Sequence, residues 1–140
     1  MKMNRYKLLL VVLLIVGCSE PTPPAFDDIE YLEYQKPDGN RPNYTAILLY
    51  KGDVTEKRLI DIVKIFNQSY EKAVLVKIFS STQAYQNEKN NVYGDIYDSD
   101  YLLFYVKNIR NWGAYKGFNE IRWMQVKGGL SHLLGTKYKL

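Results

Sequence analysis

The stretch "YTAILLYKGDVTEKRLIDIVKIF", residues 44–66, decides the fold. Residues 44–51 form a nearly continuous apolar run of strand length, which is typical of a central strand covered on both faces. After a Gly-Asp turn, Asp53 and Glu56 have the spacing of an N-cap and its capping-box partner. Over about residues 55–70 the apolar positions recur as one helix face, at Leu59, Ile62, Val63 and Phe66. The stretch predicts a strand followed by an amphipathic helix.

A second strand follows the helix. Residues 73–79, "AVLVKIF", alternate between two faces, with Val74, Val76 and Ile78 on one side. Because a helix between two strands favours a right-handed parallel crossover, these two strands are expected to run parallel.

The remaining elements complete a small sheet. Ser80 or Ser81 can cap a short polar helix that extends to about Lys89. Residues 101–107 and 119–126 read as two strands that pair as an antiparallel hairpin. The sequence therefore predicts an α+β (or α/β) two-layer sandwich of order β-α-β-α-β-β, with a mixed four-stranded sheet.

The N-terminus has the pattern of an export signal. A basic start is followed by nine consecutive apolar residues, 8–16, whereas a membrane-spanning helix needs about 20. A basic flank, a short apolar run and a small exit residue together indicate a signal peptide. The alternative is a buried N-terminal strand or helix.

The residues "IVGC", 15–18, resemble the lipobox of bacterial lipoproteins. The resemblance implies cleavage after Gly17 and acylation of Cys18 by palmitate-type chains, which makes the lipid bilayer a partner of the chain. Ser19 follows the cysteine. In that family, residues other than Asp at this position direct the protein to the outer membrane, on its periplasmic side or at the cell surface.

Cleavage would change the charge balance. It would remove three of the 19 basic and none of the 15 acidic side chains, so that the net charge would fall from +4 to +1. A nucleic-acid-binding domain needs a basic patch, and no nucleic-acid partner is expected. Cys18 is the only cysteine. Its acylation would leave no thiol for a disulfide.

The five prolines all lie between residues 21 and 42, which is typical of an extended tether. Within this segment, residues 26–34, "FDDIEYLEY", have enough apolar side chains to form an edge strand or a docking segment. The predicted organisation is a signal peptide (1–17), an acylated tether (18–42), one α/β domain (43–128) and a C-terminal tail (129–140).

Large aromatic side chains occupy the predicted hairpin loop at residues 111–118. Aromatic rings in a loop either pack back over the sheet or meet a partner, because their exposure to water is costly. The candidate binding residues are Trp112, Tyr115, Phe118 and Trp123.

Catalytic residue sets are not recognised. The single histidine, His132, lies in the tail, and motifs for zinc, redox or phosphate-loop chemistry do not occur, so no metal or cofactor is expected. The acidic candidates for a hydrolase pair are Asp95, Asp98, Asp100 and Glu120.

These features predict a membrane-tethered binding module of the cell envelope, of accessory, inhibitor or immunity type, with a protein partner. Two alternatives remain. One is a carbohydrate-binding domain that stacks sugars on Trp112, Tyr115 and Trp123, and the other is a carboxylate-dependent envelope hydrolase.

Overall fold

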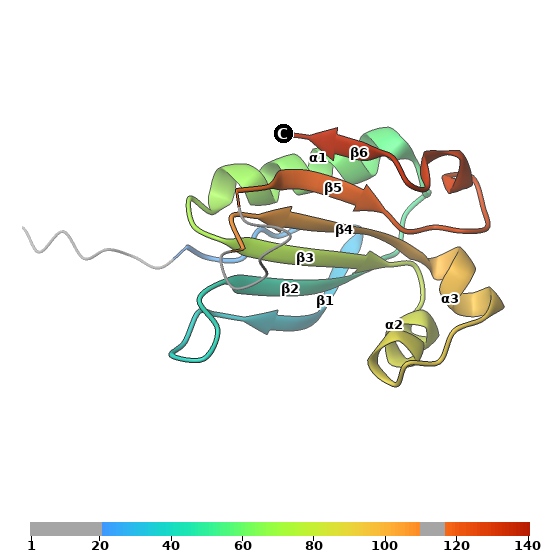
Figure 1. Ribbon diagram of the computed structural model, residues 1–140, viewed down its shortest axis with the longest axis horizontal. Coiled ribbons are helices and arrows are strands. Elements are labelled where there is room, and N and C mark those ends of the chain that lie inside the picture. Colours follow the sequence, from blue (N-terminus) through green and yellow to red (C-terminus); the bar gives the residue numbers. More distant parts are fainter. Residues whose placement is uncertain (1–20, 110–116) are drawn as a thin grey trace, which may run out of the picture.

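The computed structural model describes residues 21–109 and 117–140 as an α+β fold with one six-stranded mixed sheet (Figure 1). The strands lie side by side in chain order. Their bounds are β1 Ile29–Gln35, β2 Tyr44–Tyr50, β3 Val74–Phe79, β4 Tyr101–Lys107, β5 Asn119–Trp123 and β6 Lys137–Lys139. The helices are α1 Glu56–Ser69, α2 Thr82–Lys89 and α3 Asp95–Asp100, and a 3-10 turn, η2, spans Ser131–Leu133.

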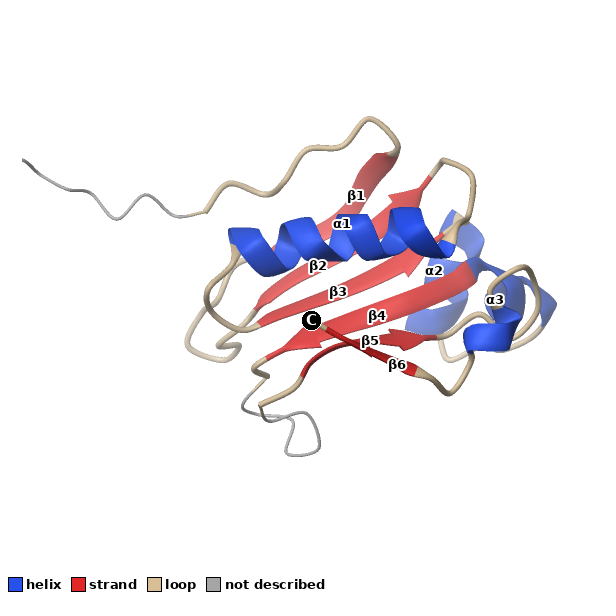
Figure 2. Cartoon of the chain, turned by 90° about the horizontal axis from the view of Figure 1, so that it is seen from above, coloured by secondary structure: helices blue, strands red, loops and turns tan. Residues whose placement is uncertain are grey.

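The predicted strand directions are confirmed. Strands β2 and β3 are parallel and are connected through α1, while β4 and β5 pair antiparallel. The other neighbouring pairs, β1–β2, β3–β4 and β5–β6, are also antiparallel. Helix α1 lies along one face of the sheet, and α2 and α3 gather at one end of it (Figure 2).

The predicted number of strands, four, is wrong. Strand β1 comes from the proline-containing segment and adds an outer strand to β2, which is the edge-strand alternative for residues 26–34. Strand β6 comes from the C-terminal tail and pairs with β5. The alternation of β1 is interrupted by a register shift between Tyr31 and Glu33, and β6 is three residues long. Neither segment therefore has a clear period-two pattern.

The main core lies between α1 and the sheet. The four residues of the predicted helix face, Leu59, Ile62, Val63 and Phe66, are fully buried. They share the core with the predicted inward residues of β3, Val74, Val76 and Ile78. Among the described residues, no helix is both long and apolar enough to cross a membrane.

The predicted N-cap of α1 is wrong. Helix α1 begins after Thr55, whose Oγ1 accepts a hydrogen bond from the Arg58 N–H at 3.3 Å, and not after Asp53. The Asp53 backbone carbonyl instead accepts a hydrogen bond from the Tyr50 hydroxyl at 2.7 Å, which keeps this residue in the turn. Residues 95–100, which carry the acidic candidates Asp95, Asp98 and Asp100, form the short helix α3. Of the two serines predicted as alternative N-caps of α2, Ser80 and Ser81, the structure uses Ser81.

Residues 24–28, here called the N-terminal strap, pack against α1 before β1 begins (Figure 2). The Phe26 ring stacks on Phe66 with 6.0 Å between ring centroids. The Pro24 carbonyl accepts a hydrogen bond from the Tyr31 hydroxyl at 2.5 Å, and Asp28 pairs with Arg58. The strap is therefore part of the folded core and not a free linker.

Candidate functional site

The face of the sheet opposite α1 carries a mixture of polar and apolar side chains, here called the second face. Strand register aligns them in two rows across the sheet. One row is Glu33, Ile47, Lys77, Phe104 and Arg122, and the other is Gln35, Thr45, Leu75, Val106 and Glu120. Helix α2 covers one end, where Ala84 and Tyr85 cluster with Ile47 and Phe79. The rest of this face is not covered by a helix of the described chain.

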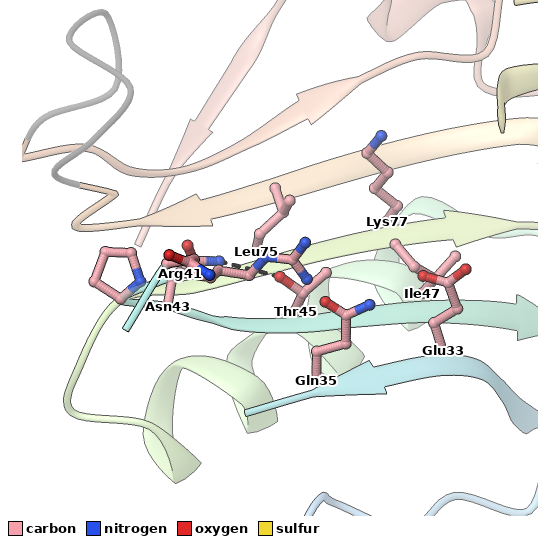
Figure 3. A pocket seen from close by; sticks show the side chains of 10 residues that line it. Glu33, Gln35, Arg41, Asn43, Thr45, Ile47, Leu75 and Lys77 are labelled. Carbon is pink, nitrogen blue, oxygen red and sulfur yellow. Dashed lines mark hydrogen bonds between the residues drawn. The ribbon is translucent and has the colours of Figure 1, made fainter. Parts of the chain in front are cut away.

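A pocket of about 410 Å³ lies on the second face beside the β1–β2 loop, residues 36–43 (Figure 3). Thr45, Ile47 and Leu75 form its floor, and each is less than one-tenth exposed. In Figure 3 the Arg41 side chain extends from the loop over β2 and β3, while Lys77 rises from β3. The remaining lining residues are Glu33, Gln35, Asn40, Pro42 and Asn43.

The loop that carries Arg41 is ordered by its own hydrogen bonds. The Asp38 carboxylate oxygen Oδ1 accepts hydrogen bonds from the backbone N–H groups of Asn40 and Arg41, each at 2.8 Å. This is the local bonding that makes aspartate common at turns. At the end of the loop, the Asn43 amide donates to the Thr45 hydroxyl at 3.1 Å. The turn therefore places the base of Arg41 at the rim of the pocket.

Helix α2 supplies partners for the charges on the far side of the pocket. Glu33 accepts hydrogen bonds from the Tyr85 hydroxyl and from Lys89, the latter at 3.0 Å, and these bonds lower the pKa of its carboxyl. Lys77 pairs with Glu88. By contrast, the Arg41 guanidinium makes no hydrogen bond or ion pair within residues 21–109 and 117–140. Arg41 lies near enough to Glu33 for its charge to help lower the pKa of that carboxyl, but the two groups form no ion pair. The pocket therefore has, at its loop side, one cation without a direct partner.

The aromatic candidates are not brought together at this pocket. Trp112 and Tyr115 lie outside the described residues. Phe118 is half-buried, with the Arg122 guanidinium 5.7 Å from its ring centroid. Trp123 is only 4% exposed and belongs to the core beneath α1. Trp123 is therefore unavailable for stacking on a ligand in this fold.

The acidic candidates have partners in the fold. Asp95 and Asp98 both contact Lys127, and this ammonium group lowers the pKa of Asp95. Asp100 accepts a hydrogen bond from Ser80 at 3.0 Å, and the largely buried Glu120 pairs with Arg122 at 3.0 Å. None of the four lines the second-face pocket or the smaller pocket between α1 and Tyr138.

The described residues contain no group of three or more His, Cys, Asp or Glu side chains that could hold a metal ion. His132 is exposed in η2. Gly17 and Cys18 lie outside the described residues.

The pocket residue that the sequence analysis missed is Arg41. The alternation of β3 puts Lys77 on the face opposite Val74, Val76 and Ile78, but residues 36–42 were assigned to the tether. The signal that points to an ordered loop is the Pro-Asp-Gly-Asn sequence at 37–40, which is typical of a turn between two strands. It becomes informative once residues 29–35 are recognised as a strand.

No protein-family model, curated protein sequence or solved structure matches the chain. The functional assignment therefore depends on the motif at the N-terminus and on the geometry of the second face.

Proposed function

We propose that this chain is a lipid-anchored lipoprotein of the bacterial cell envelope and that its α+β domain acts as a binding module. The observation that carries the binding role is the second-face pocket, where a free guanidinium lies beside a floor of aliphatic side chains. Ligand sites in proteins commonly combine an apolar lining with a few polar groups in this way.

The anchor in this proposal is Cys18, because it ends a lipobox-like sequence. The structure limits how far the folded domain can lie from this anchor. The strap is already packed on α1 at Pro24 and Phe26. Six residue steps from Cys18 to Pro24 span at most about 20 Å when fully extended. An acylated Cys18 would thus hold the domain close to the bilayer surface.

A binding role is supported over hydrolysis by the state of the acidic residues. A glycosidase-type pair requires two carboxyl groups facing each other across a cleft. Asp95 and Asp98 instead share Lys127, and Glu120 is engaged by Arg122. These contacts favour a structural role for the carboxylates, with the pocket as the place where a partner or ligand is recognised.

Metabolic labelling with palmitate tests the anchor. The wild-type chain is expected to be labelled and to partition with membranes, whereas Cys18→Ala is expected to be unlabelled, because the thiol that receives the acyl chain is gone. A labelled Cys18→Ala protein would overturn the lipoprotein assignment.

Membrane fractionation tests the destination. Ser19→Asp is the matched variant, since it retains Cys18 and changes only the sorting position. We expect the wild type in outer-membrane fractions and Ser19→Asp in inner-membrane fractions of a diderm host. Equal distribution of the two proteins would contradict outer-membrane sorting while leaving acylation intact.

Affinity capture from detergent-solubilised envelopes tests the binding role. We expect the wild-type chain to retain a stoichiometric envelope protein. Recovery of neither a protein nor envelope polysaccharide would contradict a binding module.

A further inference from the structure

We propose that the second-face pocket binds the C-terminal residue of a peptide, with its carboxylate on Arg41 and its apolar side chain on the floor formed by Ile47 and Leu75. This inference rests on the proposed binding function, for which it names the site and the chemical class of ligand.

Arg41 supplies the positive charge that would bind the carboxylate. Its guanidinium extends over the pocket and has no hydrogen-bond or ion-pair partner in the described part of the chain (Figure 3). A guanidinium presents a planar set of donors that matches a carboxylate with two parallel hydrogen bonds. The carboxylate of Glu33 does not fill this role, because it accepts hydrogen bonds from Tyr85 and Lys89 on α2. An incoming carboxylate would supply the missing partner.

The floor and the rim of the pocket suit the side chain and the backbone of a C-terminal residue. Ile47 and Leu75 each retain 6% of their exposure, at the bottom of a pocket of about 410 Å³. That volume lies within the usual range for small-ligand sites, and an aliphatic floor favours an apolar side chain. At the rim, the exposed Gln35 amide has no hydrogen bond within the described residues, so it can bind the peptide group that precedes the C-terminal residue.

The charges around the pocket favour a carboxylate over a phosphate. The pocket is lined by two cations, Arg41 and Lys77, and by the Glu33 carboxylate. Lys77 is already paired with the nearby Glu88 carboxylate, which leaves Arg41 as the lining cation without a direct partner. A phosphate dianion would be repelled by these carboxylates and would find only one guanidinium to balance its charge. A monoanionic carboxylate matches the single available cation.

The test is a titration of the isotope-labelled full-length chain in detergent, followed by amide chemical shifts. The probes are acetyl-alanyl-leucine and its C-terminal amide, which differ only in the carboxylate. We expect the acid to bind in the millimolar range and to shift the amides of Thr45, Ile47 and Leu75. The amide probe should bind roughly tenfold more weakly or worse, since it lacks the charge-assisted hydrogen bonds.

Three variants identify the contact. Arg41→Gln should weaken binding of the acid by roughly tenfold, and Arg41→Lys should weaken it less, because the charge remains while the paired hydrogen bonds are lost. Lys64→Gln is the matched control, as it removes an exposed cation of α1, on the opposite face. It should leave the affinity unchanged. The melting midpoint of Arg41→Gln should equal that of the wild type, since the guanidinium has no partner in the described fold.

The proposal is overturned by equal binding of the acid and amide probes, by shifts that map away from the pocket, or by an Arg41→Gln protein that binds like the wild type. Tighter binding of inorganic phosphate than of the acid probe at the same residues would also overturn it. Affinity capture from detergent-solubilised envelopes separates failure of the peptide site from failure of the binding role. A chain that retains an envelope protein but does not bind the acid refutes the peptide site alone, while a chain that retains neither a protein nor polysaccharide refutes the binding role.

Discussion

Arg58 and Asp28, which are 30 residues apart in the sequence, are joined by two parallel hydrogen bonds, from Nε to Oδ2 at 2.8 Å and from Nη2 to Oδ1 at 2.7 Å. This pair fastens the N-terminal strap to α1 beside the Phe26 ring, whose centroid lies 5.9 Å from the Arg58 guanidinium carbon. The hydrogen bonds from Arg58 lower the pKa of Asp28. The strap is therefore held by a charged pair as well as by aromatic packing.

Replacement of Arg58 by lysine tests the paired geometry. Arg58→Lys keeps the charge and loses the two parallel hydrogen bonds, so we expect the free energy of unfolding to fall by about 0.5–1 kcal/mol. Limited proteolysis within residues 21–28 should become faster. The control is Lys57→Gln, which breaks the exposed Lys57–Asp61 pair on the same helix and should cost less than about 0.5 kcal/mol without exposing the strap. Identical cleavage of both variants would contradict the fastening role.

The Asp28–Arg58 pair also predicts a pH dependence. Arg58 lowers the pKa of Asp28 in the folded state. The stability that this pair contributes is therefore complete at pH values above the ordinary pKa of aspartate, and it is lost as the pH falls through the folded-state pKa. The Asp28→Asn protein lacks this contribution at every pH. Urea midpoints of the two proteins should therefore differ at neutral pH and converge as the pH falls through the lowered folded-state pKa of Asp28, with the wild type falling more steeply. A constant difference down to acid pH would contradict this linkage.

Phe66 is the packing centre of the strap and of α1. Its ring is fully buried and stacks on both Phe26 and Tyr70. Phe66→Ala should reduce the free energy of unfolding by about 3–5 kcal/mol. Its neighbour Ile65 is 37% exposed, so Ile65→Ala serves as the control and should cost less than about 1 kcal/mol. Equal losses in chemical denaturation would mean that the helix face is assigned incorrectly.

Lys107 of β4 closes the C-terminal end of α1. Its ammonium donates hydrogen bonds to the backbone carbonyls of Asn67 and Tyr70 at 2.9 and 2.7 Å. Helix α1 has no basic residue in its own last turn, so a cation from the sheet satisfies these carbonyls. Lys107→Met should lower the free energy of unfolding by about 1–2 kcal/mol. Lys64→Met, at an exposed position of the same helix, should change it by less than about 0.5 kcal/mol.

Gly128 is required by the turn that follows β5. Its φ is +135°, and an added Cβ would lie 2.5 Å from Nε2 of Gln125. Gln125 itself donates to the Ser99 carbonyl and accepts from the Leu130 N–H. Gly128→Ala should therefore lower the melting midpoint by several degrees, equivalent to more than about 1 kcal/mol. Gly129→Ala is the matched control, because its Cβ would meet nothing within 4 Å, and its midpoint should stay near that of the wild type.

The parts of the fold that were predicted correctly depend on local patterns. The apolar face of α1 and the alternation of β3 appear as periods of 3.6 and 2 in the sequence, because neighbouring turns and pleats alone create them. A serine cap of α2, at Ser80 or Ser81, was also predicted, since the capping hydroxyl reaches only three residues along the chain. These features require no knowledge of the other strands.

The candidate site was predictable only in part. Trp112, Tyr115 and Phe118 were chosen for their size and their expected place in a loop. Trp123 was expected in the strand that follows, as part of a stacking platform, yet it lies on the inner side of β5 beneath α1. That outcome follows from strand register, which turns alternate residues to opposite faces. Arg41 was missed because residues 36–43 become a loop between paired strands only when β1 joins the sheet.

The sequence by itself determined the strand–helix–strand unit over residues 44–79 and the antiparallel pair that follows it, because short-range spacing specifies which side chains share a face. Only the tertiary structure decided that residues 24–28 pack on α1, that β1 and β6 extend the sheet, and that Arg41 lies over Ile47 and Leu75. The physical reason is that these contacts join residues far apart in the chain. They form only when the entropy of closing the intervening loops is offset by burial and strand pairing, and no local pattern records that balance.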